Sequence, residues 1–279
     1  MCARSRAALT AAHRETMPET TFDPAIHGFA FGNSWEFTAV EKQRLRETFA
    51  KYLTWGGVLS ALTLGPVGAV VTLLGIRAIR KAIEAELSQE SFGLCGGMSF
   101  AALDYFYSPF QVPRESQPPL GPPLRTYLWD RQVHSFESDL ARLCAWVILL
   151  KHVPSSWPFR DATGRLLAWT EREWETVKAQ LDGGDPVPLM LVRDTADPFE
   201  NHQVLAIDYD DGEMPNQVTI YLYDPNYPYD PQETDKESTI VLEFDERLRS
   251  VKESRVARPV LRGFFRETYT PHDPPAVIE

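Results

Sequence analysis

The spacing of apolar residues changes along the chain, from a helical period in the first two thirds to a strand-like pattern in the last third. Runs rich in Val, Ile, Leu, Tyr and Phe, separated by Gly, Pro, Asp and Asn, predict strands at 187–193, 202–209, 217–223, 238–244 and 259–266. Because helices come first and strands follow them, the pattern favours an α+β fold with an antiparallel sheet.

Helical spacing and good helix formers predict helices at 38–53, 77–88, 95–107 and 124–150, and another that begins at Thr170. The stretch 124–150 is expected to form two helices that are broken near Ser135. Thr170 and Glu173 have the spacing of a capping box, which predicts a helix start. Several prolines cluster at 108–123, so this segment is expected to be a structured loop.

A run of 23 residues without a charge, 54–76, raises the possibility of a membrane segment. The run is long enough to cross a bilayer, and Lys51 and Arg77 flank it on either side. The alternative is that Gly65 and Pro66 divide it into two short apolar helices that form a hairpin, buried against the domain or covered by a partner. Both alternatives stay open at the level of the sequence.

The composition is that of a globular protein, with 43% hydrophobic and 24% charged residues. A net charge of −11 argues against nucleic acid as a partner, because phosphate binding needs a basic face. The three cysteines, Cys2, Cys95 and Cys144, do not make a disulfide framework and suit a reducing compartment. We therefore expect a cytoplasmic protein, with membrane association through 54–76 as an option.

The 279 residues suffice for one large domain or two small ones. We divide the chain into an N-terminal extension or loop (1–37), a helical segment that contains the apolar run (38–84), a main domain (85–268) and a C-terminal tail (269–279). The predicted helices and strands of the third segment carry the candidate chemistry.

Cys95 stands out because it is flanked by glycines, in Q-E-S-F-G-L-C-G-G-M-S-F, and opens a predicted helix. The positive end of a helix lowers the pKa of a thiol, which favours the nucleophilic thiolate. Gly93, Gly96 and Gly97 are expected to let a substrate backbone approach closely. The Cys95 backbone N–H and the side-chain amide of Gln89 are candidate donors to an oxyanion.

A nucleophilic cysteine needs a base, and His202 is the histidine that opens a predicted strand, in N-H-Q-V-L-A-I-D-Y. The next predicted strand ends in Y-L-Y-D-P-N. If the two strands form an antiparallel hairpin, Asp224 comes to lie beside His202 and can orient its ring, with Asn226 as the alternative. A calcium loop at Asp224, Asn226 and Asp230 is less favoured, because the spacing lacks the glycine and the final Glu of an EF-hand.

The ordered set of Gln, Cys, His and Asp resembles the papain-like cysteine peptidases, and within them the domains that process double-glycine leader peptides of bacteriocins. The matching segments, within 85–245, are Q-E-S-F-G-L-C-G-G-M, L-D-G-G-D-P-V-P-L-M-L-V, N-H-Q-V-L-A-I-D-Y and L-Y-D-P-N. The resemblance implies Cys95 as nucleophile, His202 as base, Asp224 as orienting residue and Gln89 as oxyanion donor. It also implies that the helix of Cys95 packs on the sheet.

The sequence departs from that family in three places, one of which is the N-terminal hydrophobic segment, which has no counterpart in a simple peptidase domain. Cys95 is followed by Gly-Gly-Met, and extra helices and a proline-rich loop at 108–165 separate it from His202. The insertion contains a polar and aromatic group that is expected to line a groove or brace the Cys95 helix, or else to form an ordinary amphipathic helix face: Trp129, Asp130, Arg131 and Gln132.

These patterns predict a thiol-dependent hydrolase, peptidase- or amidase-like, that works through an acyl-enzyme on a peptide or protein substrate. Two alternatives remain: an inactive papain-like module that binds a peptide or docks on a membrane, and a membrane-active effector, toxin or acyltransferase with the same triad. No cofactor and no metal are expected.

Overall fold

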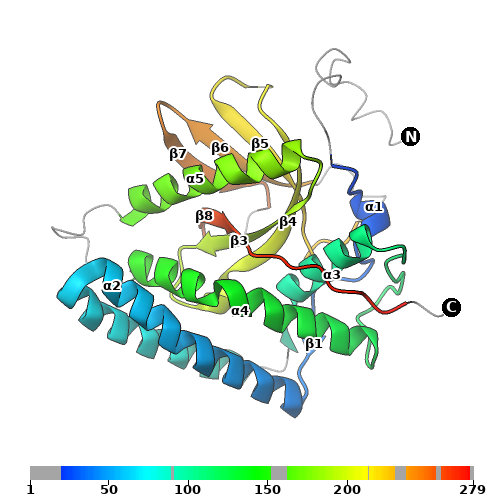
Figure 1. Cartoon of the computed structure of the whole chain (residues 1–279), viewed down its shortest axis with the longest axis horizontal. Coiled ribbons are helices and arrows are strands. Elements are labelled where there is room, and N and C mark those ends of the chain that lie inside the picture. The colour runs from blue at the N-terminus through cyan, green and yellow to red at the C-terminus, as the bar shows by residue number, and fades with distance from the viewer. Residues whose placement is uncertain are drawn as a thin grey trace.

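One antiparallel sheet organises the C-terminal half of the chain (Figure 1). The computed structural model describes residues 20–88, 91–151, 162–212, 214–229, 237–255 and 259–276, without the side chains at 52–74, 86, 91, 92 and 138. The strand order is β7-β6-β5-β4-β3-β8, formed by β3 (Val187–Arg193), β4 (His202–Asp210), β5 (Gln217–Tyr223), β6 (Ser238–Phe244), β7 (Leu248–Glu253) and β8 (Leu261–Arg266). The outer strands β7 and β8 also approach each other, so the sheet curls towards a barrel.

Both faces of the sheet are covered, which explains the uninterrupted apolar run of β3. Leu189 and Leu191 point into a core that α5 (Ala162–Asp182) closes, whereas Met190 and Val192 point into a second core on the opposite face. Since successive side chains of a strand alternate between faces, a strand buried on both sides has no polar positions.

The second core lies under three helices: α2 (Ala39–Glu86), α3 (Cys95–Tyr107) and α4 (Leu124–Lys151). The capping box that Thr38 and Glu41 form starts α2. The chain reverses direction within α2, because Arg46 Nε near its start lies 3.4 Å from Glu84 Oε2 near its end (Figure 1). This reversal agrees with the hairpin that the sequence offered as an alternative for 54–76, whereas its burial against the domain or a partner stays a prediction, because the side chains at 54–74 lie outside the described ones.

The described helices include none that combines the length and the apolar character needed to cross a membrane.

The N-terminal segment reaches the sheet and α3 through short elements. It contains α1 (Pro24–His27) and β1 (Trp35–Glu36), and β1 pairs in antiparallel fashion with β2 (Ser91–Phe92), which directly precedes α3. Through this pairing, residues near position 33 lie beside the start of α3.

Most predicted elements are confirmed, several with the same bounds, including 95–107, 187–193, 217–223 and 238–244. The segment 108–123 is a loop, as expected. The sequence missed β7, because L-R-S-V-K-E holds two apolar residues in a short edge strand.

Two predictions at helix boundaries are wrong. The stretch 124–150 is one helix, and Ser135 fits inside it because its hydroxyl donates to the carbonyl of Gln132, 2.9 Å away. Helix α5 starts at Ala162, so Thr170 lies inside it and is no cap. The Thr170 hydroxyl instead accepts the N–H of Phe264 in β8, and Glu173 accepts that of Arg266, so both polar groups serve tertiary contacts.

Candidate active site

Cys95 is the first residue of α3, and a residue distant in sequence caps this end of the helix. The N-cap residue, Leu94, has no capping side chain of its own, and its N–H donates to Oδ1 of Asn33. The N–H of Gly97 donates to Oε1 of Gln132 in α4 at 2.9 Å. Two of the four free amides of this helix end are thereby satisfied.

The remaining two amides of the helix end belong to Cys95 and Gly96. No described hydrogen bond occupies either of them. They lie next to the Cys95 thiol at the positive end of the α3 dipole, where N–H groups stabilise a negative charge. The start of α3 therefore offers a nucleophile and oxyanion donors at one place.

His202 is held at the start of β4 by a short turn that Asn201 organises. The turn contains η3 (Pro198–Glu200), and the side-chain amide of Asn201 donates to the carbonyls of Asp197 and Pro198. Oδ1 of Asn201 accepts the N–H of Arg193 at 2.8 Å, which ties the turn to β3. His202 then pairs with Leu191 of β3, so its backbone is fixed on both sides.

Asp224 directly follows β5 and lies beside His202, as the hairpin geometry predicted. Strands β4 and β5 are antiparallel neighbours, and Nε2 of His202 is 2.6 Å from Oδ1 of Asp224. Both side chains are almost fully buried. Asn226, the alternative orienting residue, instead accepts a hydrogen bond from Asn33 Nδ2 and donates its N–H to Asp224.

The electrostatics of this pair favour a charged imidazolium. Burial alone lowers the pKa of His202, but the charge and hydrogen bond of Asp224, together with the interaction with Cys95, outweigh burial and raise the pKa to about 10. Burial likewise acts to raise the pKa of Asp224, yet His202, the Asn226 amide and Arg193 hold it below its ordinary value. At neutral pH the ring is therefore protonated, with Nε2 donating to Asp224 and Nδ1 left to face the thiol.

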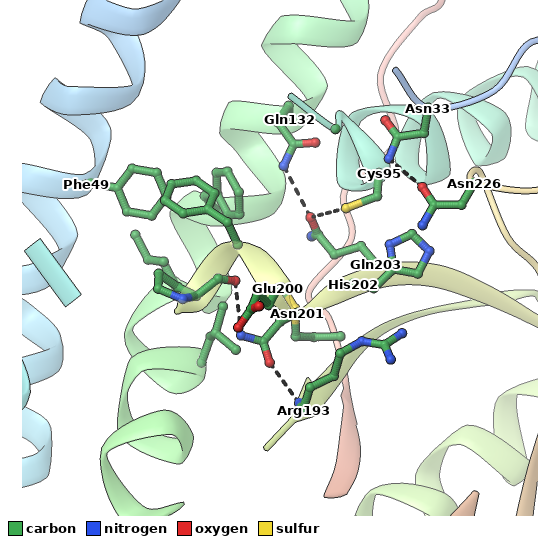
Figure 2. Close-up of a pocket in the computed structure, with 17 residues that line it drawn as sticks. Asn33, Phe49, Cys95, Gln132, Arg193, Glu200, Asn201, His202, Gln203 and Asn226 are labelled. Atoms are coloured by element: carbon green, nitrogen blue, oxygen red, sulfur yellow. Dashed lines mark hydrogen bonds between the residues drawn. The ribbon is translucent and has the colours of Figure 1, made fainter. Parts of the chain in front are cut away.

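A buried polar cluster forms the wall behind the thiol (Figure 2). The Cys95 thiol donates to Oε1 of Gln203 over 3.8 Å, and Nε2 of Gln132 donates to the same oxygen at 3.2 Å. The Gln203 amide in turn donates to Oε1 of Glu267 at 2.5 Å. Burial, and then the nearby Asp139, raise the pKa of Glu267 well above its ordinary value.

Gly96 and Gly97 serve packing rather than substrate access, which corrects the interpretation from the sequence for these two glycines, whereas Gly93 is among the residues that line the cavity. A Cβ at Gly96 would lie 2.2 Å from Oε1 of Gln203 and 2.3 Å from Oγ of Ser135. A Cβ at Gly97 would lie 2.3 Å from the carbonyl oxygen of Leu128 in α4. Both glycines are buried, so they allow α3 to approach its neighbours rather than a ligand.

A cavity of 340 Å³ opens beside Cys95 and His202. Amide side chains and the two candidate catalytic residues lie at one end, and aromatic side chains, Phe49 among them, lie at the other (Figure 2). Of the predicted site residues, Cys95, His202 and Asp224 come together here, and Gln89 lies outside the described residues. Within the part of the chain that is described, no cluster of His, Cys, Asp and Glu is arranged to hold a metal ion.

The sequence did not identify Gln203, Asn33 and Glu267 as parts of the site. Gln203 had a usable signal, because it is a polar residue inside a predicted strand whose neighbours are apolar. Asn33 had none, since its place beside Leu94 depends on the pairing of β1 with β2. Gln132 was expected to line a groove or brace the Cys95 helix, and it does both.

No protein-family model, curated protein or solved structure matches this chain.

Proposed function

We propose that the protein is a thiol-dependent hydrolase, peptidase- or amidase-like, in which Cys95 is the nucleophile, His202 the acid and base, and Asp224 the orienting residue. The observation that carries this proposal is the convergence of three elements on one cavity. The thiol sits at the start of α3, and the His202 ring interacts with it while bound to Asp224 over 2.6 Å.

In the proposed reactive form, the Cys95 thiol has lost its proton and the sulfur lies beside the imidazolium that Asp224 holds. The Cys95 sulfur attacks the substrate carbonyl carbon, a C–S bond forms, and the carbonyl electron pair moves onto oxygen near the Cys95 and Gly96 amides. The C–N bond then breaks, and Nδ1 of His202 gives its proton to the leaving amine. The neutral ring next takes a proton from water, which attacks the thioester, releases the acid and restores the thiolate.

The resemblance to papain-like peptidases, which rests on the same residues, points to the same chemistry. The mixed fold, with the helix of Cys95 packed on an antiparallel sheet, agrees with the architecture that this resemblance implies. The papain-like assignment itself, and Gln89 as oxyanion donor, remain part of the proposal.

The test is the rate at which iodoacetamide alkylates Cys95 at pH 7, followed by mass spectrometry of each cysteine. We expect Cys95 to react at least tenfold faster than glutathione, which serves as the unperturbed thiol. Cys144 is an internal control, because it is buried and burial raises its pKa to about 12, so it should stay unlabelled in the folded protein.

Substitution of the imidazole separates an activated thiol from an exposed one. His202→Ala should bring the rate of Cys95 alkylation down to that of glutathione. If Cys95 reacts no faster than glutathione, and His202→Ala leaves the rate unchanged, the enzyme proposal is wrong and an inactive peptide-binding module becomes the better description. If Cys95 is activated but acyl groups pass from it to added amines rather than to water, the protein is an acyltransferase.

A further inference from the structure

The far end of the cavity is built from aromatic and aliphatic side chains that come from separate elements. Phe49 of α2 packs against Phe136 of α4, with ring centroids 5.2 Å apart, and against Phe199 of η3, at 5.1 Å. Leu140 and Met190 complete the lining. These mutual ring contacts fix the wall, so the space is preformed rather than a gap that the side chains can close.

The size of the cavity is more than a small residue needs. The whole cavity, with its polar and its apolar end, has a volume of 340 Å³, about twice the ~150 Å³ that accommodates one benzene ring in an engineered protein cavity. A large apolar side chain therefore fits beyond the thiol, and its burial against Phe49 and Phe199 removes apolar surface from water. A glycine at the same place leaves the volume unfilled.

The near end of the cavity has the polar groups that a peptide backbone needs. Asn33, Gln132, Gln203 and Asn226 line it, and most of their amide groups bond to one another or to the start of α3, whereas the side-chain NH2 of Asn226 makes no described hydrogen bond. Primary amides both donate and accept hydrogen bonds, which suits the alternating N–H and C=O groups of a peptide. A simple alkyl chain has no acceptor for the Asn226 donor, which favours a peptide over a fatty acyl group.

We propose that the substrate is a peptide whose residue on the acyl side of the cleaved bond has a large apolar side chain, preferably aromatic, and that Phe49, Phe136 and Phe199 form its binding pocket. This inference rests on the proposed thiol chemistry. It differs from what the resemblance to double-glycine leader peptidases implies, because those substrates present glycine at this position.

The test uses chloromethyl ketones that share one reactive group and differ in the group next to it: N-acetyl-phenylalanyl, N-acetyl-glycyl and an unbranched alkyl chain of similar length. Mass spectrometry gives the second-order rate constant of each probe at Cys95. We expect the phenylalanyl probe to react at least tenfold faster than the other two, relative to the rates of all three with glutathione.

Variants on the pocket wall connect this preference to the cavity. Phe199→Ala should reduce the phenylalanyl-to-glycyl ratio at least fivefold. Phe106→Ala is the matched control, because Phe106 is also half-buried against the same core but lies outside the cavity lining, and it should leave the ratio unchanged. Phe199→Leu should give an intermediate ratio and keeps the test informative if the alanine variant does not fold.

The possible failures are distinguishable. Equal rates for the phenylalanyl and glycyl probes, or a preference for the glycyl probe, overturn the pocket while leaving an activated Cys95 in place. An alkyl probe that matches the phenylalanyl probe overturns the peptide class. If no probe labels Cys95 faster than glutathione, the thiol chemistry itself is absent.

Discussion

Helix α3 carries a buried polar cluster at each end, and the two are built in opposite ways. In its C-terminal half, Asp104 accepts hydrogen bonds from Tyr127, Tyr269 and the N–H of His272, and it forms a fully buried ion pair with Arg131. At the N-terminal end, the Cys95 sulfur makes one long hydrogen bond, 3.8 Å to Gln203, and otherwise interacts with the His202 ring. Oε2 of Glu267 has no hydrogen-bond partner among the described residues.

The same two elements supply both clusters, which makes the contrast informative. Consecutive residues of α4, Arg131 and Gln132, reach the two ends of α3, and residues of the segment after β8, Glu267 and Tyr269, do the same. The Asp104 carboxylate already accepts as many hydrogen bonds as it can, so it cannot bind a further ligand. The Cys95 thiol, with one long hydrogen bond, can still react with one. We infer that the Asp104 cluster stabilises the fold and that the Cys95 cluster is kept open for chemistry.

The largest effect is expected from Asp224→Asn, which should lower kcat/KM about 10³- to 10⁴-fold at pH 7. The substitution removes the charge that raises the pKa of His202, while burial, which lowers this pKa, remains. The alkaline limb of the pH profile, set by loss of the imidazolium near pH 10, should therefore move to lower pH. The measurement is hydrolysis of an N-acetyl-phenylalanine anilide between pH 5 and 11.

Asp245→Asn provides the control, because Asp245 is exposed and lies outside the cavity lining.

The pH dependence of stability gives a second test of the role of Asp224. Since the pKa of His202 is raised on folding, its contribution to folding is fully present below the unfolded pKa of about 6.5 and is lost as the pH rises through 10. The stability difference between wild type and Asp224→Asn should shrink over that range. An unmoved alkaline limb would show that Asp224 does not set the charge of the ring.

Arg131→Met tests the other cluster and should lower the free energy of unfolding by about 3–5 kcal/mol, because it leaves the buried Asp104 carboxylate without its cation. Urea denaturation measures the loss. The control is Arg44→Met, whose ion pair with Asp130 is about 40% exposed on both sides and should contribute about 0–1 kcal/mol. In the folded variant, Cys95 alkylation should stay within about twofold of wild type. A fall as large as that of His202→Ala would mean that the two clusters are not separable.

The parts of the site that local patterns determine were predictable from the sequence. The bounds of α3 and β5 follow from apolar spacing, and the position of Asp224 beside His202 follows from hairpin geometry. The cavity was not predictable, because Phe49 and Phe199 meet only after α2 has folded back and η3 has turned. A pattern along the chain gives the face on which a residue lies, but not the distant atoms that it contacts.

The role of the glycines next to Cys95 also depends on contacts with residues distant in sequence, and a third prediction tests this role. Gly96→Ala should cost about 1–3 kcal/mol of stability, because the new Cβ would overlap with the buried side chains of Gln203 and Ser135. Gly121→Ala is the control, since a Cβ there meets no atom within 4 Å. Urea denaturation of both variants is the measurement. A stable Gly96→Ala protein that has lost only its reactivity would restore the view that the glycine provides clearance for a substrate.

The smallest effect is expected from Ser135→Ala, which tests how firmly the buried polar cluster behind Cys95 holds the thiol in place. The Ser135 hydroxyl donates to the carbonyl of Gln132 and lies 3.5 Å from Oε1 of Gln203, so its loss should cost about 1 kcal/mol of stability. Because Gln132 still holds the Gln203 amide, Cys95 alkylation should change less than threefold. Ser99→Ala is a matched control, since its buried hydroxyl contacts the backbone carbonyl of Gln203 and not its side chain. If Ser135→Ala changes the alkylation rate tenfold while Ser99→Ala does not, the hydroxyl itself tunes the thiol, and the open cluster at this end of α3 is more tightly coupled than its few contacts indicate.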